Sequence, residues 1–262
     1  MSSFSKLRSI EIVEDRTAES RCDDGFLSLA RLRLRNRYSD GSHSRVYECD
    51  VVSRPGADAV VAVLYEIDGR RRVNVLLRDM PRAPVYLRVH KRFVHPDPRT
   101  YRTLRELVAG VVEASDPTGD AGLHRRAAVE SHEEVALEIA AEKFRTLGGE
   151  TFASPGTSDE KLYFCAAATK LGDARAGAGD GSVMEEGADV VLLELSDAIA
   201  ACRAGDIPDM KTELGLLRLA DHLGYVAQLD CFVDELPESL QGRYRRLGVA
   251  AAPGAAGRRE PL

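Results

Sequence analysis

Two apolar runs joined by a turn dipeptide constrain the fold of this 262-residue chain more than any other feature. Residues 59–67 read AVVAVLYEI, Asp68-Gly69 follows, and residues 73–77 read VNVLL. A short apolar run bounded by turn residues is typical of a buried strand, and Asp-Gly is a strong signal for the turn of a hairpin. We therefore predict a buried antiparallel hairpin at residues 59–77.

A more polar hairpin is predicted upstream. Apolar and polar residues partly alternate over residues 26–34 and again over residues 46–51, with a turn at Ser39-Asp40-Gly41-Ser42 between them. Arg54-Pro55-Gly56 separates the two hairpins and marks the expected domain boundary. We divide the chain into a strand-rich domain (1–55), a main domain (56–236) and a flexible tail (237–262) that has little with which to build a core.

The remainder of the main domain mixes helix and strand signals, which indicates the α+β class. In chain order we expect a helix over 123–139, strands within 140–169 with a turn at Ser154-Pro155-Gly156, a long loop over 171–187, a strand over 190–195, a helix from an N-cap at Ser196 to residue 203, and an amphipathic helix over 209–223.

Composition and charge argue against several classes of protein. The net charge of −6 gives no overall attraction to nucleic acid or anionic membranes, and no run approaches the roughly 18 apolar residues of a membrane helix. The start of the chain lacks the apolar core of a secretory signal, so we expect a cytoplasmic protein. The cysteines are scattered without a C-x-x-C pair and are expected to be reduced thiols: Cys22, Cys49, Cys165, Cys202 and Cys231.

Residues 82–105 form a basic segment in which Asp97 is the only acidic residue before Glu106. Its cations are Arg82, Arg88, Lys91, Arg92, Arg99, Arg102 and Arg105. Such a run is either a solvated loop or a surface that faces phosphate groups, and the sequence leaves both interpretations open. Processing of nucleic-acid ends would rest on this segment alone, so nucleic acid is not expected as a partner.

Three glutamates carry the strongest chemical signal. Glu133 and Glu134 lie three and four residues after Glu130 in a predicted helix, so the three carboxylates share one side of it. Like charges at this spacing repel one another. A hard divalent cation such as Mg²⁺ takes oxygen ligands, relieves the repulsion and bridges to substrate phosphates. From spacing alone, a solvated acidic face is the competing interpretation.

The same helix resembles the Nudix box, whose family pattern is G-x5-E-x7-R-E-U-x-E-E-x-G-U with U a bulky apolar residue. The resemblance is carried by Ala109-Gly110 followed by Glu130-x-x-Glu133-Glu134-x-Ala136-Leu137. Flanking landmarks look like the ADP-ribose and nucleotide-sugar pyrophosphatase branch: Arg54-Pro55-Gly56-Ala57, Arg105-Glu106-Leu107-Val108-Ala109-Gly110, Ser154-Pro155-Gly156-Thr157-Ser158-Asp159-Glu160, and Asp206-Ile207-Pro208-Asp209-Met210-Lys211-Thr212. The resemblance covers about residues 45–225. It implies an α/β/α sandwich with a mixed sheet, preceded by a small antiparallel β domain that takes part in homodimerisation.

The resemblance also implies a reaction, in which water attacks a phosphorus of a nucleoside diphosphate sugar with Mg²⁺, or Mn²⁺ in its place, as cofactor. The implied metal ligands are the backbone carbonyl of Ala109 and the carboxylates of Glu130, Glu133 and Glu134. The implied catalytic residues are Glu133, Glu134 and Glu186, with Glu185 as the reserve for the last. Substrate contacts are expected from Arg82, Arg105, Glu106 and Glu160, while Lys211 and Thr212 are interpreted first as structural or dimer contacts.

The sequence departs from the family pattern within the box. Val129 stands at the position of the Arg, Ser131 at an apolar position and Ala136 at the position of the glycine. An Arg at position 129 would lie one turn before Glu133 and could neutralise and orient it. Ala in place of Gly is harmless in helical backbone and costly where φ must be positive.

The loop before the box helix is longer than in the pattern, and Asp116 stands where the first Glu would fall. Arg126 lies one turn before Glu130 and either replaces part of the missing Arg or is a solvated cation. Two functions stay open. We favour a Mg²⁺-dependent nucleotide-sugar hydrolase of reduced activity, because a purely structural helix does not need the glutamate cluster. The alternative is a catalytically weakened Nudix-fold protein that binds a nucleotide as sensor or partner.

Overall fold

A mixed β-sheet forms the centre of the computed structural model, which describes residues 25–177 and 188–246. Its strands are β3 (Ala59–Ile67), β4 (Val73–Met80), β5 (Leu104–Glu106), β6 (Val108–Val111), β7 (Arg145–Thr146), β8 (Thr151–Phe152), β9 (Lys161–Ala168) and β10 (Asp189–Glu194). The main path runs β10-β4-β3-β9-β7, while β5 pairs with β4, β6 with β3 and β8 with β9. The β3–β9 pair is parallel and the other pairs are antiparallel.

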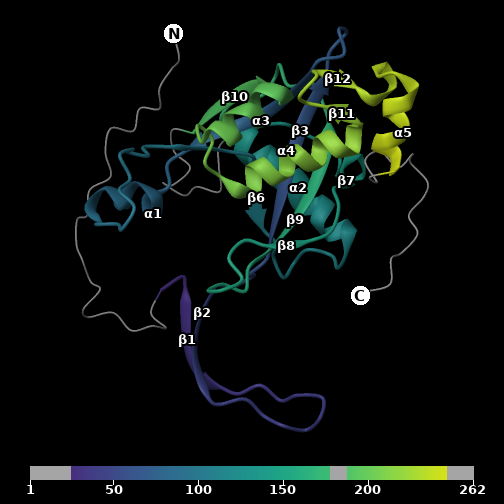
Figure 1. Cartoon of the computed structure of the whole chain (residues 1–262). Coiled ribbons are helices and arrows are strands. Elements are labelled where there is room, and N and C mark those ends of the chain that lie inside the picture. Colours follow the sequence, from purple (N-terminus) through teal and green to yellow (C-terminus); the bar gives the residue numbers. More distant parts are fainter. Residues whose placement is uncertain (1–24, 178–187, 247–262) are drawn as a thin grey trace.

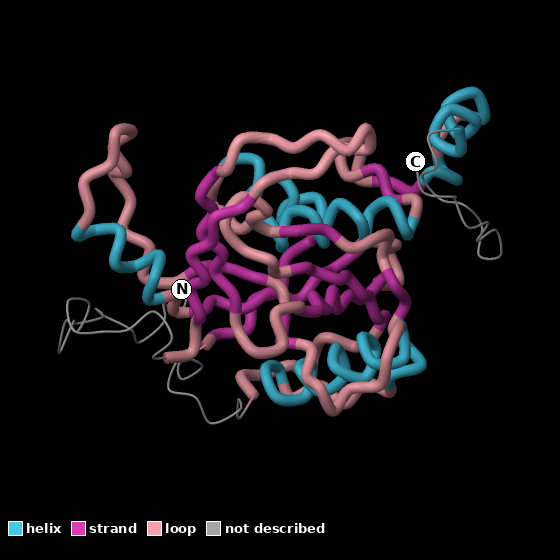
Figure 2. Tube along the Cα trace, turned by 90° about the horizontal axis from the view of Figure 1, so that it is seen from below, coloured by secondary structure: helices cyan, strands magenta, loops and turns pink. Residues whose placement is uncertain are grey.

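Strand β3 is buried on both faces, which explains its apolar run. Successive side chains of a strand point to opposite faces. Val61 and Val63 belong to the core shared with helices α3 (Leu195–Ala204) and α4 (Met210–Leu223), whereas Val60 and Ala62 belong to the core shared with α2 (Asp120–Val135). Figure 2 shows the strands as a middle layer with helices on both sides. The predicted hairpin of β3 and β4 and the α+β class are both confirmed.

One edge of β3 is divided between two strands. Strand β6 pairs with residues 59–62 of β3, and β4 pairs with residues 65–67. Beyond Val75 the end of β4 pairs with β5 instead, where Arg78 lies opposite Glu106. Only Leu107 separates β5 from β6. The end of β4 and β6 both reach helix α2, because Arg78 of β4 and Ala109 of β6 each contact Glu134.

The upstream hairpin is also confirmed. Strands β1 (Ser28–Leu34) and β2 (Tyr47–Ser53) form a two-stranded antiparallel sheet that extends away from the main body (Figure 1). Its base is attached to the main domain, because the Val52 N–H donates to the Thr157 carbonyl at 2.8 Å and the Ser53 hydroxyl donates to Asp159 at 2.9 Å. Residues 1–24 of the predicted N-terminal domain lie outside the described residues.

The basic segment is more regular than its sequence indicates. Helix α1 (Ala83–Tyr86), with Pro84 in its first turn, leads into a 3-10 turn (Leu87–His90) to one side of the sheet (Figure 1). Asp97 ties the following loop together by accepting hydrogen bonds from Arg88 at 2.9 Å and from the Tyr101 hydroxyl at 3.2 Å. Lys91, Arg92, Arg99 and Arg102 are exposed, which fits both the solvated loop and the phosphate-facing surface.

Two predictions for the C-terminal half need correction. Glu194, and not Ser196, occupies the N-cap of α3, while the Ser196 hydroxyl donates to Asp230 at 3.1 Å. The tail predicted to be flexible over 237–262 includes a helix, α5 (Glu238–Arg246). Tyr244 of α5 packs against a small core formed near β11 (Tyr225–Val226) and β12 (Cys231–Phe232), which stabilises the helix. Residues 247–262 lie outside the described residues.

Helix α2 ends at Val135, four residues before the predicted end, because Ala136 adopts a left-handed conformation with φ 54° and ψ 31°. Its N–H donates to the His132 carbonyl and the Leu137 N–H donates to the Ser131 carbonyl, which is the pattern of a left-handed C-terminal cap. Ala at this position therefore occupies a conformation that favours glycine.

We expect Ala136→Gly to raise the free energy of unfolding by about 1 kcal/mol, because the left-handed conformation costs an L-residue about 1–2 kcal/mol. Urea denaturation measures the change. Ala128→Gly, at a half-buried position inside the same helix, is the matched control and should lower the free energy of unfolding by about 0.5–1 kcal/mol. A loss of stability at position 136 would contradict the assigned cap.

Candidate functional site

A cavity of about 600 Å³ lies against β6 and one side of α2. Its volume is within the range of small-molecule sites, which is about 300–1,000 Å³. Acidic and basic side chains from separate parts of the chain line it: Glu113, Glu130, Glu133, Glu134, Glu160 and Asp209 together with Arg54, Arg82, Arg126 and Lys211. The structure therefore brings the three glutamates of α2, Glu130, Glu133 and Glu134, together with a set of cations.

Close packing of α2 on β6 fixes the position of Glu130. A Cβ atom added at Gly110 of β6 would lie 1.8 Å from Glu130 Oε1, so only glycine leaves room for this carboxylate against the strand. Any larger residue at position 110 would therefore displace the Glu130 side chain from its place against the strand. Ala109, the neighbouring residue, also lines the cavity.

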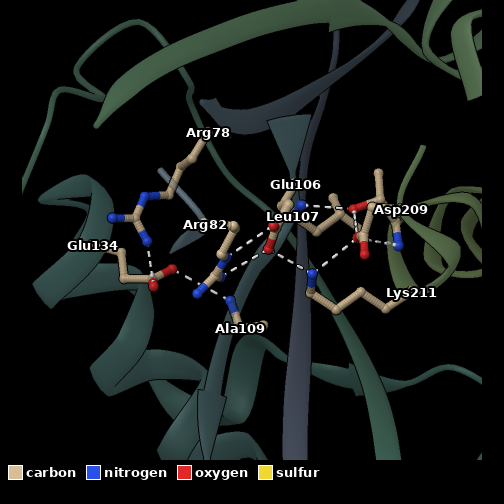
Figure 3. Close-up of polar contacts among 9 residues, drawn as sticks. Arg78, Arg82, Glu106, Leu107, Ala109, Glu134, Asp209 and Lys211 are labelled. Carbon is tan, nitrogen blue, oxygen red and sulfur yellow. Dashed lines mark hydrogen bonds and ion pairs between the residues drawn. The ribbon is translucent and has the colours of Figure 1, made fainter. Parts of the chain in front are cut away.

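Glu134 is buried and forms an ion pair with Arg78 (Figure 3). Its other oxygen, Oε2, accepts a hydrogen bond from the Ala109 N–H at 3.3 Å. Arg78 follows Leu76 by two residues in β4 and therefore points to the same face of the sheet, toward α2. Arg78 was not among the residues predicted for the site. The available signal was a charged residue that follows directly on the apolar run of a buried strand.

Arg126 is also buried, so its interpretation as a solvated cation is wrong. Its guanidinium lies 2.9 Å from carboxylate oxygens of Asp116 and Glu113 and 3.7 Å from Glu130. Burial opposes ionisation of Asp116, but the hydrogen bonds from Arg126 and the Glu113 N–H outweigh it and lower the pKa of Asp116. Arg126 thus links Glu113 and Asp116 of the long loop before α2 to Glu130 of the helix.

A second ion cluster is centred on Glu106 (Figure 3). Arg82 donates to both Glu106 oxygens at 2.9 and 2.8 Å, and Lys211 Nζ donates at 2.6 Å. Burial favours the neutral acid, but the two cations outweigh it and lower the pKa of Glu106. Glu106, predicted to contact substrate, is covered by Arg82 and Lys211 and does not line the cavity.

The start of α4 supports this cluster. Asp209 caps the helix by accepting from the Thr212 N–H at 3.0 Å and also accepts from Lys211 at 2.9 Å. The Thr212 hydroxyl in turn accepts from the Leu107 N–H at 3.0 Å. Thr212 is therefore structural, as predicted, whereas Lys211 lines the cavity and belongs to the candidate site.

The remaining predicted contacts divide into three groups. Glu160 lines the cavity and pairs with Arg54 at 2.5 Å. Arg105 does not line it and instead donates to Asp79 at 2.9 Å from the Arg105 Nε and Nη2 atoms. Glu185 and Glu186 lie outside the described residues.

The carboxylates of Glu130, Glu133 and Glu134 on α2 are chemically suitable ligands for Mg²⁺, because this ion prefers oxygen ligands. Within residues 25–177 and 188–246, however, no group of three or more His, Cys, Asp and Glu side chains is arranged to hold a metal ion. Glu134 faces Arg78, and Glu130 lies near Arg126. Binding of a cation here requires these carboxylates to turn toward one another.

No protein-family model matches the chain, and a search of curated proteins finds no match either. Among the helices of the described residues, none combines the length and the apolar character that crossing a membrane requires.

We expect Glu106→Gln to lower the free energy of unfolding at pH 7 by about 1–3 kcal/mol, because it removes the buried carboxylate that Arg82 and Lys211 share. The lowered pKa of Glu106 means that its contribution is present above the unfolded pKa, about 4.3, and is lost as the pH falls through the folded pKa. Urea denaturation at pH 7 and at lower pH values measures this. The difference in free energy of unfolding between wild type and Glu106→Gln should decrease as the pH falls.

The control is Glu142→Gln, which changes an exposed glutamate. It should leave the free energy of unfolding within about 0.5 kcal/mol of wild type. If the difference in free energy of unfolding between wild type and Glu106→Gln instead increased as the pH falls, the lowered pKa assigned to Glu106 would be contradicted.

Proposed function

We propose that this protein is a Nudix-type hydrolase that cleaves the diphosphate of a nucleoside diphosphate sugar such as ADP-ribose with Mg²⁺. The observation that carries the proposal is the lining of a single cavity by Glu130, Glu133 and Glu134 and by cations from separate segments of the chain. A diphosphate needs both kinds of group, since cations contact its oxygens and carboxylates hold the metal that neutralises it.

The cations are held in place before any ligand arrives. Arg82 and Lys211 are fixed by Glu106, and Arg54 is fixed by Glu160. The Arg82 side chain is nevertheless 40% exposed, so part of its guanidinium is accessible from the cavity. These residues bind and orient the two phosphates, and their preorganisation reduces the entropy lost on binding.

In the proposed reaction, the oxygen of one water molecule forms a bond to one phosphorus of the diphosphate. The bond between that phosphorus and the bridging oxygen breaks, and the bridging oxygen leaves with the other phosphate. The products are a nucleoside monophosphate and a sugar phosphate. Near pH 7 both protons of the water are released to solvent, because the second pKa of each phosphate monoester is about 6. When bound by the box glutamates, Mg²⁺ supplies neutralisation of the phosphate charge and activation of water.

The second candidate is a catalytically weakened protein of the same fold that binds a nucleotide as sensor or partner. The pairing of Glu134 with Arg78 favours it, because a carboxylate engaged by a guanidinium is less available to a metal ion. This candidate shares the ligand class with the first and differs in the absence of turnover.

The test incubates the protein with ADP-ribose and Mg²⁺ or Mn²⁺, and chromatography measures the release of AMP and ribose 5-phosphate. Glu130→Gln and Glu133→Gln should each lower kcat/KM by about 10- to 100-fold, because a carboxylate near the metal is lost. Reaction in ¹⁸O-labelled water identifies the phosphorus that is attacked.

Glu138→Gln is the matched control, because Glu138 follows the same helix and its side chain is 84% exposed. It should keep wild-type kcat/KM. Tight nucleotide binding without cleavage of any member of a diphosphate panel would contradict the hydrolase and support the binding protein.

A further inference from the structure

Residues 87–103 form a projection that we call the basic arm. It leaves the main body after α1, returns to the sheet at β5, and lies to one side of the layers (Figures 1 and 2). Internal contacts give it a defined shape, because Asp97 accepts a hydrogen bond from Arg88 at 2.9 Å. The Arg99 guanidinium donates to the Gly205 carbonyl and so attaches the arm to the end of α3. The arm is thus a structured feature of the surface.

The arm carries a local excess of positive charge. It contains five arginine and lysine side chains, and Asp97 is its only acidic residue. Arg88 pairs with Asp97 at 2.9 Å. The other four are exposed, and in the described part of the chain none of them forms an ion pair with a carboxylate: Lys91, Arg92, Arg99 and Arg102. The arm therefore presents cations that are free to meet an anionic partner.

The negative charge of the whole chain does not cancel this excess at the arm. Fields between exposed charges are screened over about 8 Å at physiological ionic strength. A projecting segment therefore acts on a nearby surface mainly with its own charge, and less with the net charge of −6 that belongs to the whole chain. An anionic surface that meets the arm first is attracted by it.

The arm also exposes apolar side chains among its cations. Val94 is fully exposed, more than any other large apolar residue of the described chain, and Val89 is 52% exposed. An isolated exposed valine needs no explanation. Val94, however, directly follows Arg92 and Phe93 and precedes His95, so its side chain lies among basic residues. Apolar groups that enter the acyl boundary and cations that attract anionic lipids are the two contributions to binding at a membrane surface.

The aromatic residues of the arm argue against nucleic acid as the partner. Single-stranded nucleic acid is bound by stacking its bases on accessible aromatic rings. Phe93 is half-buried with the Arg88 guanidinium 4.1 Å from its ring centre, and Tyr101 is half-buried with that of Arg99 at 5.7 Å. Both rings are occupied by arginines of the arm itself. The most exposed side chain is the aliphatic Val94, which suits hydrocarbon and not a base.

We propose that the basic arm docks reversibly on an anionic lipid surface. Val89 and Val94 enter the boundary between headgroups and acyl chains, while Lys91, Arg92 and Arg102 contact headgroup phosphates. The inference goes beyond the proposed function and does not depend on it, because no residue of the arm lines the cavity.

The experiment is co-sedimentation of the full-length protein with vesicles of phosphatidylcholine and phosphatidylserine in equal parts, and with vesicles of phosphatidylcholine alone. We expect binding to the mixed vesicles only, and a partition coefficient that falls as salt is added. Lys91→Gln and Arg92→Gln should each lower the partition coefficient about fivefold, which is the contribution of one cation near an anionic surface. Val94→Ser should lower it about tenfold, because its apolar contact is lost.

Two matched controls lie outside the arm. Arg243→Gln removes an exposed cation from α5, on the opposite side of the molecule from α1 (Figure 1). Leu229→Ser removes an apolar side chain that is 59% exposed. Both should keep the wild-type partition coefficient. Thermal unfolding of each variant should give the wild-type Tm, which separates loss of binding from loss of fold.

Three results would overturn the proposal. The first is a wild type that does not sediment with the mixed vesicles, or that sediments equally with phosphatidylcholine alone. The second is a set of arm variants that bind the mixed vesicles as the two controls do. The third is binding to a labelled oligouridylate that depends on Lys91 and Arg92 but not on Val94, without vesicle binding, which would assign the arm to nucleic acid. None of these results bears on cleavage of ADP-ribose, so the proposed function is tested separately.

Discussion

Burial of β3 on both faces is the constraint on which the rest of the structure depends. A strand covered by α2 on one side and by α3 and α4 on the other must be apolar where it is buried, here over residues 59–64, and its neighbours must satisfy its backbone from both edges. Strand β9 takes one edge, whereas β4 and β6 share the other. The candidate site lies where this shared edge divides, so the packing of the core determines where chemistry can occur.

Charge pairing is the second organising interaction. Ionisable groups at the site are buried only together with partners of opposite sign: Arg78 with Glu134, Arg126 with Asp116, and Glu106 with Arg82 and Lys211. Such pairs contribute little net stability, but each one fixes a side chain with hydrogen bonds of defined direction. These pairs hold the charged side chains around the cavity in place. The exposed glutamate and lysine atoms of the cavity lining remain accessible to a ligand.

The sequence predicts local features of this protein well and contacts between distant residues poorly. The β3–β4 hairpin and the shared side of Glu130, Glu133 and Glu134 follow from spacing within a few residues. The positions of Arg78 and Lys211 depend on partners in other elements, which no local pattern encodes. For Ala136 the sequence allowed two outcomes, and the left-handed end of α2 selected one.

The attachment of the β1–β2 hairpin has a consequence for ligand binding. Thr157 and Asp159 hold the base of the hairpin, and Glu160, the next residue along the same loop, lines the cavity and is held by Arg54. A ligand that changes the position of this loop must therefore change the free energy of fixing the hairpin. Thermodynamic reciprocity requires the converse to the same extent, so whatever immobilises the hairpin alters the affinity of the cavity by an equal coupling energy.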